Sequence, residues 1–537
     1  MNKVGNFSRF GIMLDCSRNG VMKVEKIKFL LDCMQKMGYN ALELYSEDVY
    51  EVEGEPYFGY MRGRYTGEEL KCLDAYAQSK GIELIPCVQT LAHFTAFVKN
   101  DEVYDMVDTA DILLIGSERT YQFIDRLFAS LAKNFTSREV NIGMDEAHMV
   151  GLGKYLDKNG YKNRFDILLE HLHKVAEIAA KYGFKAHMWS DMFFRFVNNG
   201  AYCSKDVINV PEQVKKSLPD NVDLVYWDYY QVEKSAYDVM FESHKGFNSD
   251  TWFAGSAWCQ YGFAPYHTNT LRTMRPALES ANEHGVKNVL ITLWGDNGRE
   301  CSPFTLLPAM YTLTRYAEGF YEQSSIEAEF KQLFGYDYSD FVLLELPNKC
   351  KPNEFDNAKK FWNPCKSLLY TDAFMGLMDS AVKENEIMPF EEYALLFREK
   401  AKVMGEFSYL YNFMEKLCGA LAIKATLGVK TREVYESKNK QTLLRLIDEY
   451  KELVVRVEKF HEAFYELWMT DNKPQGWEIQ DVRLGGLICR LNTCIKRLTD
   501  YYNGKISKIE ELEEPVLSYM HGLANHNYEL IVSRSVL

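Results

Sequence analysis

Two adjacent carboxylates, Asp145 and Glu146, follow a short apolar segment that contains Val140, Ile142 and Gly143. Such a segment is typical of a buried β-strand, and carboxylates at the carboxyl end of a strand lie where barrel enzymes keep their catalytic groups. Because successive side chains of a strand point to opposite faces, we expect the two acids to lie in different environments. Two acids with different pKa values suit glycoside hydrolysis, so this pair is the first candidate catalytic site.

Short apolar runs alternate with segments of helical character up to about residue 320. The clearest helix is predicted over 164–181, where Phe165, Leu168 and Leu172 share one face and Gly183 follows the end. Eight strand–helix units predict an α/β fold, a closed (β/α)8 TIM barrel. An open doubly wound sheet is the alternative, but no glycine-rich phosphate loop follows the first strand. The predicted strands are 10–14, 41–45, 82–88, 140–144, 186–189, 224–230, 252–258 and 289–294.

After about residue 320 the alternation stops and long amphipathic patterns begin. Apolar residues from Leu443 to Leu467 keep a spacing of three and four, which predicts one long helix. The regions at about 389–428 and 478–502 show the same pattern. We therefore predict two domains, a catalytic barrel over 1–320 and an all-α domain over 321–537.

The composition excludes several classes of function. The net charge is −14 and no basic stripe is present, which argues against a nucleic-acid partner. No apolar run reaches a membrane-spanning length, and the first ten residues lack a signal-peptide core, so we expect no membrane association. The twelve cysteines are scattered without a CxxC pair, which favours reduced thiols and a cytoplasmic location.

Polar and aromatic side chains gather where the predicted strands end. The first strand ends in Asp15, with Arg18 shortly after it. Aromatic faces cover the C–H surface of a sugar while charged groups bind its hydroxyls, so this pattern predicts a sugar pocket, with core filling as the alternative use. Half of the eight tryptophans fall at the ends of strands five to eight, namely Trp189, Trp227, Trp258 and Trp294.

A divalent cation is the competing use for so many carboxylates. Asp15, Asp145, Asp191 and Asp296 all follow predicted strands and could converge on one ion. A shell of tryptophans suits a water-rich cation poorly, and the chain has no HxxxH pair and no Cys/His cluster for zinc. We therefore expect neither a metal nor another cofactor.

Residues 141–146 read Asn-Ile-Gly-Met-Asp-Glu, a strand-end pattern in which Asn and Gly lead into an Asp-Glu pair. Residues 13–18, 65–70 with 81–86 and His93, and 294–296 follow in a matching order along the barrel. Together these segments resemble glycoside hydrolase family 20, the β-N-acetylhexosaminidases, whose last-strand motif has Glu in the position of Asp296. The resemblance implies an exo-acting retaining enzyme that removes terminal β-GlcNAc or β-GalNAc from glycans.

In this family the acetamido group of the substrate is the nucleophile. The resemblance therefore implies that Glu146 is the general acid and later the general base. It implies that Asp145 holds the acetamido nitrogen and stabilises an oxazolinium intermediate. Asp296 would bind outer hydroxyls and His93 would support the site. The pocket walls implied by the resemblance are Trp189, Trp227 and Trp294.

The chain departs from the family pattern at two binding positions. The family's sugar-gripping Arg stands five residues before the first-strand Asp, where this chain has Phe10, and Arg9 is the nearest candidate. The family's acetamido-binding Tyr lies on strand seven. The candidates for that role here are Trp258 and Tyr261 on strand seven and Tyr229 and Tyr230 on strand six.

Because the first strand begins at residue 10, the resemblance is to a divergent branch without the small α/β domain that often precedes the barrel. Three roles stay open for the helical domain: it could buttress the barrel, form a homodimer contact, or wall the pocket through Trp477 or Arg483. Two other functions also stay open. One is a barrel glycosidase with a protein nucleophile such as Asp191, and the other is a non-catalytic glycan-binding barrel.

Overall fold

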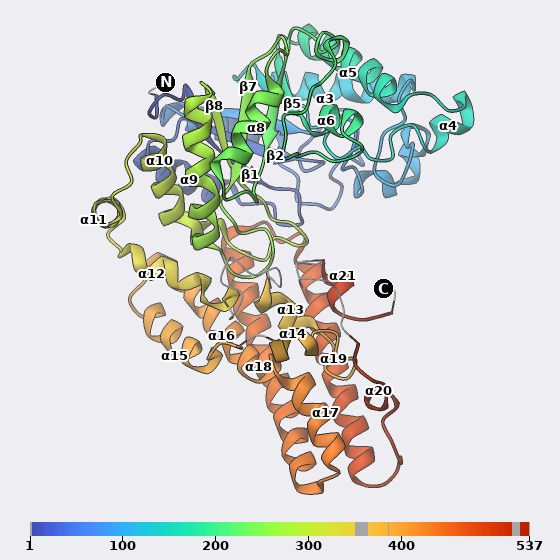
Figure 1. Cartoon of the computed structure of the whole chain (residues 1–537), viewed down its shortest axis with the longest axis vertical. Coiled ribbons are helices and arrows are strands. Elements are labelled where there is room, and N and C mark those ends of the chain that lie inside the picture. Colours follow the sequence, from blue (N-terminus) through green and yellow to red (C-terminus); the bar gives the residue numbers. More distant parts are fainter. Residues whose placement is uncertain (1–2, 350–362, 385, 518–526, 536–537) are drawn as a thin grey trace.

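The computed structural model describes residues 3–349, 363–384, 386–517 and 527–535. Its upper part is a barrel of strands surrounded by helices, and its lower part is built of helices alone (Figure 1). Within the described residues, no helix is both long enough and apolar enough to cross a bilayer.

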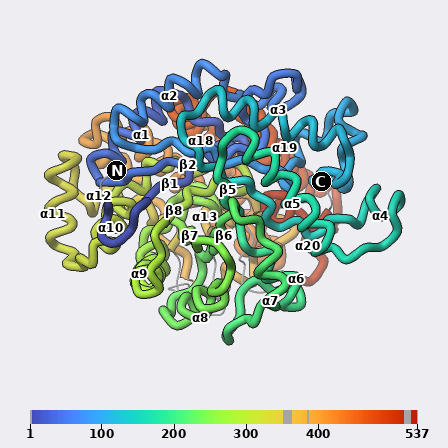
Figure 2. The backbone as a smooth tube through the Cα atoms, turned by 90° about the horizontal axis from the view of Figure 1, so that it is seen from above, coloured from blue at the N-terminus to red at the C-terminus, as the bar shows by residue number. Residues whose placement is uncertain are grey.

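The strands form a closed parallel barrel in sequence order, because β1 pairs with both β2 and β8. This confirms the predicted (β/α)8 TIM barrel and excludes the open sheet. Seen from above, the strands occupy the centre and the helices of the first half of the chain surround them (Figure 2). The strands are β1 (Arg9–Asp15), β2 (Ala41–Ser46), β3 (Glu83–Val88), β4 (Glu139–Asn141), β5 (Lys185–Trp189), β6 (Val222–Trp227), β7 (Thr251–Ser256) and β8 (Asn288–Leu293).

The helices that follow the strands are amphipathic and bury one face against the barrel. The predicted helix over 164–181 is confirmed as α5, where the Asn163 side chain accepts a hydrogen bond from the Phe165 N–H and caps the first turn. Gly183 follows its end with φ of +78°. The barrel-side helices are α1 (Val24–Met37), α2 (Gly67–Ser79), α3 (Glu118–Asn134), α4 (Lys154–Asn159), α5 (Arg164–Lys181), α6 (Asp191–Val197), α7 (Glu212–Lys215), α8 (Lys234–His244), α9 (His267–Glu283) and α10 (Leu307–Ala317), with 3-10 turns η1 (Phe97–Lys99), η2 (Asp101–Met106) and η3 (Pro303–Leu306).

The rest of the described chain is helical, as predicted. The long helix is α18, and the pattern over 389–428 divides into α15 and α16 around Gly405, whose φ is +48°. The predicted domain boundary at residue 320 falls between α10 and α11. The elements are α11 (Gln323–Phe334), α12 (Tyr338–Val342), η4 (Leu343–Asn348), α13 (Pro364–Tyr370), α14 (Asp379–Glu384), α15 (Phe390–Ala401), η5 (Gly405–Phe407), α16 (Ser408–Lys424), α17 (Leu427–Ser437), α18 (Lys440–Asp471), α19 (Trp477–Tyr502), α20 (Glu510–Glu513) and α21 (Tyr528–Ile531).

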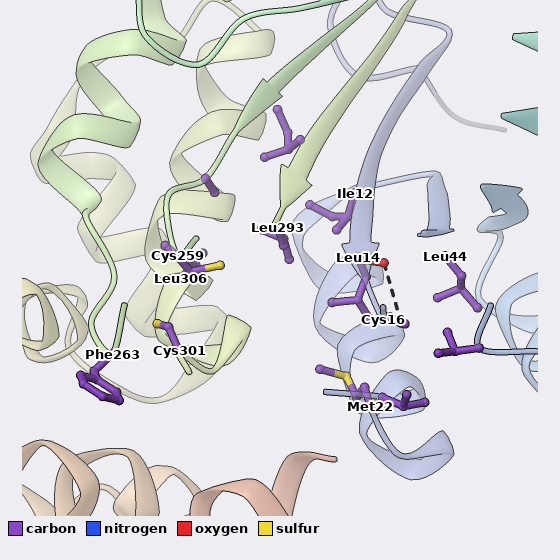
Figure 3. Packing of buried hydrophobic residues seen from close by; sticks show 14 of the residues in the cluster. Ile12, Leu14, Cys16, Met22, Leu44, Cys259, Phe263, Leu293, Cys301 and Leu306 are labelled. Carbon is purple, nitrogen blue, oxygen red and sulfur yellow. Dashed lines mark hydrogen bonds between the residues drawn. The ribbon is translucent and has the colours of Figure 1, made fainter. Parts of the chain in front are cut away.

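The helical region packs against the end of the barrel at which the strands finish. Buried residues such as Leu14 and Leu293 continue the core toward this junction, and Phe263 points from the loop after β7 toward the helices (Figure 3). The Phe263 ring lies 5.3 Å from the ring of Phe460 in α18 and 6.1 Å from that of Phe413 in α16. The carboxyl ends of the strands therefore face the helical region.

Candidate active site

The Asp145–Glu146 pair lies in a tight turn just beyond β4, which ends at Asn141 rather than at residue 144. The chain leaves the strand conformation there, because Gly143, Met144 and Glu146 all have a positive φ, between +50° and +71°. Both carboxylates consequently line one pocket. The two acids do lie in different environments, as expected, since Asp145 is half-buried and Glu146 is exposed. The reason differs from the prediction, because side chains alternate between faces only while the backbone stays extended.

This left-handed turn is held by side chains that follow the neighbouring strands, Gln89 after β3 and Asp191 after β5. The Gln89 Oε1 accepts the Met144 N–H at 3.2 Å, and the Asp191 Oδ2 accepts the Glu146 N–H at 3.1 Å. A Cβ atom on Gly143 would lie 2.1 Å from the Gln89 Oε1, so only glycine fits. Non-glycine residues in this conformation cost on the order of 1 kcal/mol each and persist where the surroundings hold them. The turn is therefore a constrained platform for the two acids.

Asp145 is fixed on both carboxylate oxygens. Gln89 donates from Nε2 to Oδ1 at 2.8 Å, and the His93 Nε2 lies 3.0 Å from Oδ2. Burial by itself would raise the pKa of Asp145, but the charge of His93 and the hydrogen bonds outweigh it and lower that pKa. Burial likewise lowers the pKa of His93, but the Asp145 carboxylate raises it to about 9. At neutral pH the pair is a carboxylate beside an imidazolium.

This ion pair predicts a pH dependence of stability. Because the folded-state pKa of His93 is about 9 and its ordinary value is 6.5, the pair's contribution is full below pH 6.5 as long as Asp145 stays ionised. That contribution is lost as the pH rises toward 9. We expect the Tm of the wild type to fall more steeply over this window than the Tm of a His93→Gln variant, as measured by thermal melts at several pH values. Parallel curves for the two proteins would contradict the assignment.

Aromatic side chains form the walls of the pocket. The Trp227 and Tyr229 rings stack with centroids 5.4 Å apart, and the Trp294 Nε1 donates to the Tyr229 hydroxyl at 3.0 Å. The Trp189 ring is 6.2 Å from that of Trp294. Across the mouth, the hydroxyls of Tyr230 and Tyr261 lie 2.8 Å apart. The described lining residues are Arg18, His93, Asp145, Glu146, Trp189, Trp227, Tyr229, Tyr230, Gln260, Tyr261, Trp294 and Asp296.

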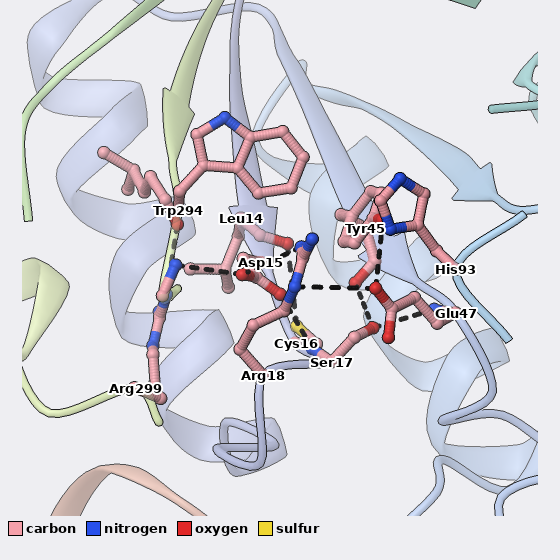
Figure 4. A network of polar contacts seen from close by, with 12 residues as sticks. Leu14, Asp15, Cys16, Ser17, Arg18, Tyr45, Glu47, His93, Trp294 and Arg299 are labelled. Atoms are coloured by element: carbon pink, nitrogen blue, oxygen red, sulfur yellow. Dashed lines mark hydrogen bonds and ion pairs between the residues drawn. The ribbon is translucent and has the colours of Figure 1, made fainter. Parts of the chain in front are cut away.

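A charged edge completes the pocket beside β1. The Arg18 guanidinium lies 4.9 Å from the ring centroids of Tyr45 and Trp294, 3.4 Å from the Asp15 Oδ2 and 3.5 Å from the Glu47 Oε1 (Figure 4). Burial raises the pKa of Asp296 to about 6, although the charge of Arg18 opposes this shift. An arginine and a carboxylate that share one edge can donate to and accept from neighbouring hydroxyls of a sugar.

Arg9 does not belong to the pocket, which corrects the expectation from the sequence. Arg9 begins β1 and Asp15 ends it, a separation of about 20 Å at roughly 3.3 Å per residue. The Arg9 guanidinium bonds to Glu83 at 2.9 Å and to Glu139 at 3.2 Å, residues that begin β3 and β4. Arg9 therefore ties strands together at the far end of the barrel, and Arg18 is the arginine that lines the pocket.

Trp258 is also placed differently from the prediction. It is buried behind the rim, with its ring 5.8 Å from Tyr230 and 5.3 Å from Tyr261, and it is not among the lining residues.

The sequence prediction assigned no role to Gln260, which lines the pocket, or to Gln89, which bonds to Asp145. Both follow strand ends, which is the signal that could have identified them. Neither Trp477 nor Arg483 lines the pocket, so neither walls it.

The structure also shows where Asp191 lies and which residues could hold a cation. The Asp191 side chain is fully buried beneath the Glu146 backbone, pairs with Arg195 at 3.0 Å, and has a pKa raised to about 7 by burial and by the charge of Asp145. Among the described residues, His93, Asp145 and Glu146 have potential ligand atoms within 4.8 Å of one another. His93 and Gln89 already occupy both oxygens of Asp145, so this group is better suited to holding the carboxylate than to binding an ion.

A closed (β/α)8 barrel with two acids in an aromatic pocket at its carboxyl end has the architecture of a glycoside hydrolase. The family comparison agrees. Residues 7–250 match the catalytic domain of glycosyl hydrolase family 20, and residues 339–530 match the Glycoside Hydrolase 20C C-terminal domain. These two models span most of the chain, which belongs to glycoside hydrolase family 20 and is a glycoside hydrolase.

The solved structures that match this chain are distant from it in sequence. An exo β-N-acetylglucosaminidase from Vibrio harveyi is 15% identical, with 63% of this chain and 58% of that chain covered and a TM-score of 0.47. The chain thus spans less than two thirds of that enzyme. A β-N-acetylhexosaminidase from Bacteroides fragilis is 18% identical, covering 62% and 71%, with a TM-score of 0.49. A chitobiase from Flavobacterium johnsoniae is 13% identical, covering 86% and 78%, with a TM-score of 0.47. None of the curated proteins matches the chain.

Proposed function

We propose that the protein is an exo-acting retaining β-N-acetylhexosaminidase that uses the acetamido group of its substrate as the nucleophile. The observation that carries the proposal is the unequal treatment of the two acids in one pocket. Asp145 is clamped as a carboxylate by Gln89 and His93, whereas the Glu146 side chain is exposed. A fixed anion and an accessible acid match the two roles that substrate assistance requires.

Glu146 handles protons in this mechanism. Its carboxyl group donates a proton to the leaving oxygen as the glycosidic bond breaks, and it later removes a proton from the attacking water. Its backbone N–H is held by Asp191, so the side chain starts from a defined point at the mouth of the pocket. The exposure of Glu146 suits contact with both the leaving group and water.

Asp145 acts on the acetamido group. Its carboxylate accepts the acetamido N–H, which turns the carbonyl oxygen toward the anomeric carbon and stabilises the positive oxazolinium that forms. Holding an intramolecular nucleophile in place supplies the advantage of proximity. The alternative protein nucleophile, Asp191, is buried and directed to the Glu146 N–H and Arg195, which disfavours the competing mechanism.

The walls support binding of one terminal sugar. Trp189, Trp227 and Trp294 offer apolar faces to the ring and the acetamido methyl, and Tyr229 beside Trp294 is the candidate donor to the acetamido oxygen. Arg18 and Asp296 face the hydroxyls. The cavity, about 110 Å³, is much smaller than the pockets of about 300–1,000 Å³ that hold drug-sized ligands. This size favours exo action on a chain end.

Hydrolysis of three aryl β-glycosides tests the proposal. We expect cleavage of the GlcNAc or GalNAc derivative, no measurable cleavage of the plain glucoside, and inhibition by a GlcNAc-thiazoline analogue. The reason is that a glucoside has no acetamido group to attack the anomeric carbon. Rapid cleavage of the glucoside would instead support a protein nucleophile, and cleavage of none of the three would contradict the proposed activity.

A further inference from the structure

The loop that follows β8, residues 294–300, carries two pocket residues, Trp294 and Asp296. The barrel holds the beginning of this loop, because the Gly295 N–H donates to the Asp15 Oδ2 at 2.9 Å. The loop also closes on itself through the Arg299 N–H, which donates to the Gly295 carbonyl at 2.8 Å. These contacts leave the middle of the loop, immediately after Asp296, without support from the barrel's own strands.

The middle of the loop has an unfavourable backbone. Asn297, Gly298 and Arg299 follow one another with φ of +52°, +129° and +55°. Two non-glycine residues in the left-handed region on either side of a glycine persist only where other parts of the molecule hold them. A Cβ atom on Gly298 would lie 2.6 Å from the Arg483 Nη1, so the helical region approaches the loop closely at this point.

The helical region supplies the donors that hold this backbone. Arg483 of α19 donates to the Asn297 carbonyl at 2.7 Å and to its Oδ1 at 3.1 Å. Lys366 of α13 donates to the same two oxygens, each at 3.1 Å. The Gln480 Nε2 donates to the Gly298 carbonyl at 3.1 Å. The Tyr528 N–H of α21 also donates to the Asn297 Oδ1, at 2.9 Å. Asn297, the neighbour of Asp296, is thus bound from three helices that are far away in the sequence.

The charges of this contact are buried together. Glu300 pairs with Lys366 at 2.7 Å and with Arg483 at 2.9 Å, and the exposed fractions of these side chains are 1%, 0% and 9%. Buried ion pairs add little net stability, because removing charges from water offsets their attraction. Their clear consequence here is geometric, since the guanidinium and the ammonium can satisfy Glu300 and Asn297 only when the loop is in one position.

We propose that Arg483 and Lys366, with Glu300, are positioning residues that set Asp296 and Trp294 for substrate. The helical region is then a working part of the active site, although none of its described residues lines the pocket. The inference rests on the proposed function, because it concerns how that pocket binds its sugar substrate.

The test compares Arg483→Met with Arg490→Met. Both arginines lie on α19, but Arg490 pairs with Asp372 inside the helical region and has no contact with the loop. We expect Arg483→Met to lower kcat/KM for the aryl N-acetylhexosaminide about 10- to 100-fold, because small misplacements of binding groups are costly. Arg490→Met should lower Tm while leaving kcat/KM within about 2-fold of the wild type. Equal kcat/KM losses in both variants would overturn the proposal.

A double-mutant cycle separates positioning from general damage. If Arg483 acts through the loop, its replacement should cost at least about 3-fold less in an Asp296→Asn background than in the wild type. If the two substitutions instead lower kcat/KM by independent factors that multiply in the double variant, the proposal is overturned. Should Arg483→Met not fold, Asn297→Gly removes the Oδ1 acceptor while tolerating the positive φ, and it is expected to lower kcat/KM in the same coupled way.

Hydrogen exchange measures how well the backbone of the loop is held, independently of enzyme activity. Backbone amides of residues 295–300 should exchange faster in Arg483→Met than in the wild type, whereas Arg490→Met should leave them unchanged. Unchanged exchange in Arg483→Met would overturn the positioning role even if the enzyme is active. A wild type that cleaves no N-acetylated aryl glycoside would contradict the proposed function, and the exchange result would still decide whether the helical region holds the loop.

Discussion

Replacing Glu146 with Gln is expected to lower kcat about 10³-fold for a substrate whose leaving group is another sugar. A sugar alkoxide leaves only when it is protonated, and the amide cannot supply that proton. The rate of the first step, cleavage of the glycosidic bond, should fall much less for a dinitrophenyl glycoside, because its leaving group needs no proton from an acid. Steady-state kinetics on the two substrates measure the difference.

The same variant should respond to azide. Azide attacks the oxazolinium without a general base, so it should restore turnover of the dinitrophenyl glycoside and yield the β-glycosyl azide. Glu177→Gln is the matched control, because Glu177 is an exposed residue of α5 that pairs with Lys174 far from the pocket. A loss in Glu146→Gln that is independent of the leaving group would show that Glu146 is not the acid.

The second large effect is expected for Asp145→Asn, which should lower kcat about 10²- to 10³-fold. The amide keeps the shape of the carboxylate but removes the negative charge that stabilises the oxazolinium and orients the acetamido N–H. Binding of a GlcNAc-thiazoline, which resembles that intermediate, should weaken by a comparable factor. Calorimetric binding and steady-state rates measure both effects.

Asp145→Asn has a second readout in His93. The carboxylate raises the pKa of His93 to about 9 against the opposing effect of burial, so its removal should bring that pKa below 6.5. NMR titration of the His93 ring measures this shift. Asp125→Asn is the control, since Asp125 lies on α3 and bonds to Lys181 and Tyr182 instead. Wild-type turnover in Asp145→Asn would rule out its role in substrate assistance.

The barrel and the long helices could be predicted because their signals are local. Helix α5 begins at Arg164 and ends at Lys181, as the apolar periodicity and Gly183 predicted. The eight apolar runs identified all the strands of the closed barrel, although β4 is shorter than its apolar pattern. Burial of apolar faces is the dominant contribution to folding, so the apolar residues that form these faces recur periodically in the sequence and can be recognised there.

The placement of single site residues was less predictable. Arg9 and Arg18 are both near the first strand in sequence, but strand direction puts them at opposite ends of the barrel, and only Arg18 lines the pocket. Trp258 was predicted on strand seven, but β7 ends at Ser256 and Trp258 lies in the loop behind Tyr230 and Tyr261. Sequence position identifies the strand end, whereas the direction of a side chain depends on the backbone conformation of the loop around it.

The sequence by itself determined the barrel and the helical region, and it showed two acids and several tryptophans at strand ends. Each of these features depends on residues that are adjacent or periodic in the chain. Only the tertiary structure decided that Asp145 and Glu146 share a pocket, because a left-handed turn clamped by Gln89 and Asp191 replaces the end of β4. It also decided that α13 and α19 hold the loop beside Asp296. Contacts between residues far apart in the chain have no local signature, so they appear only when the whole chain is folded.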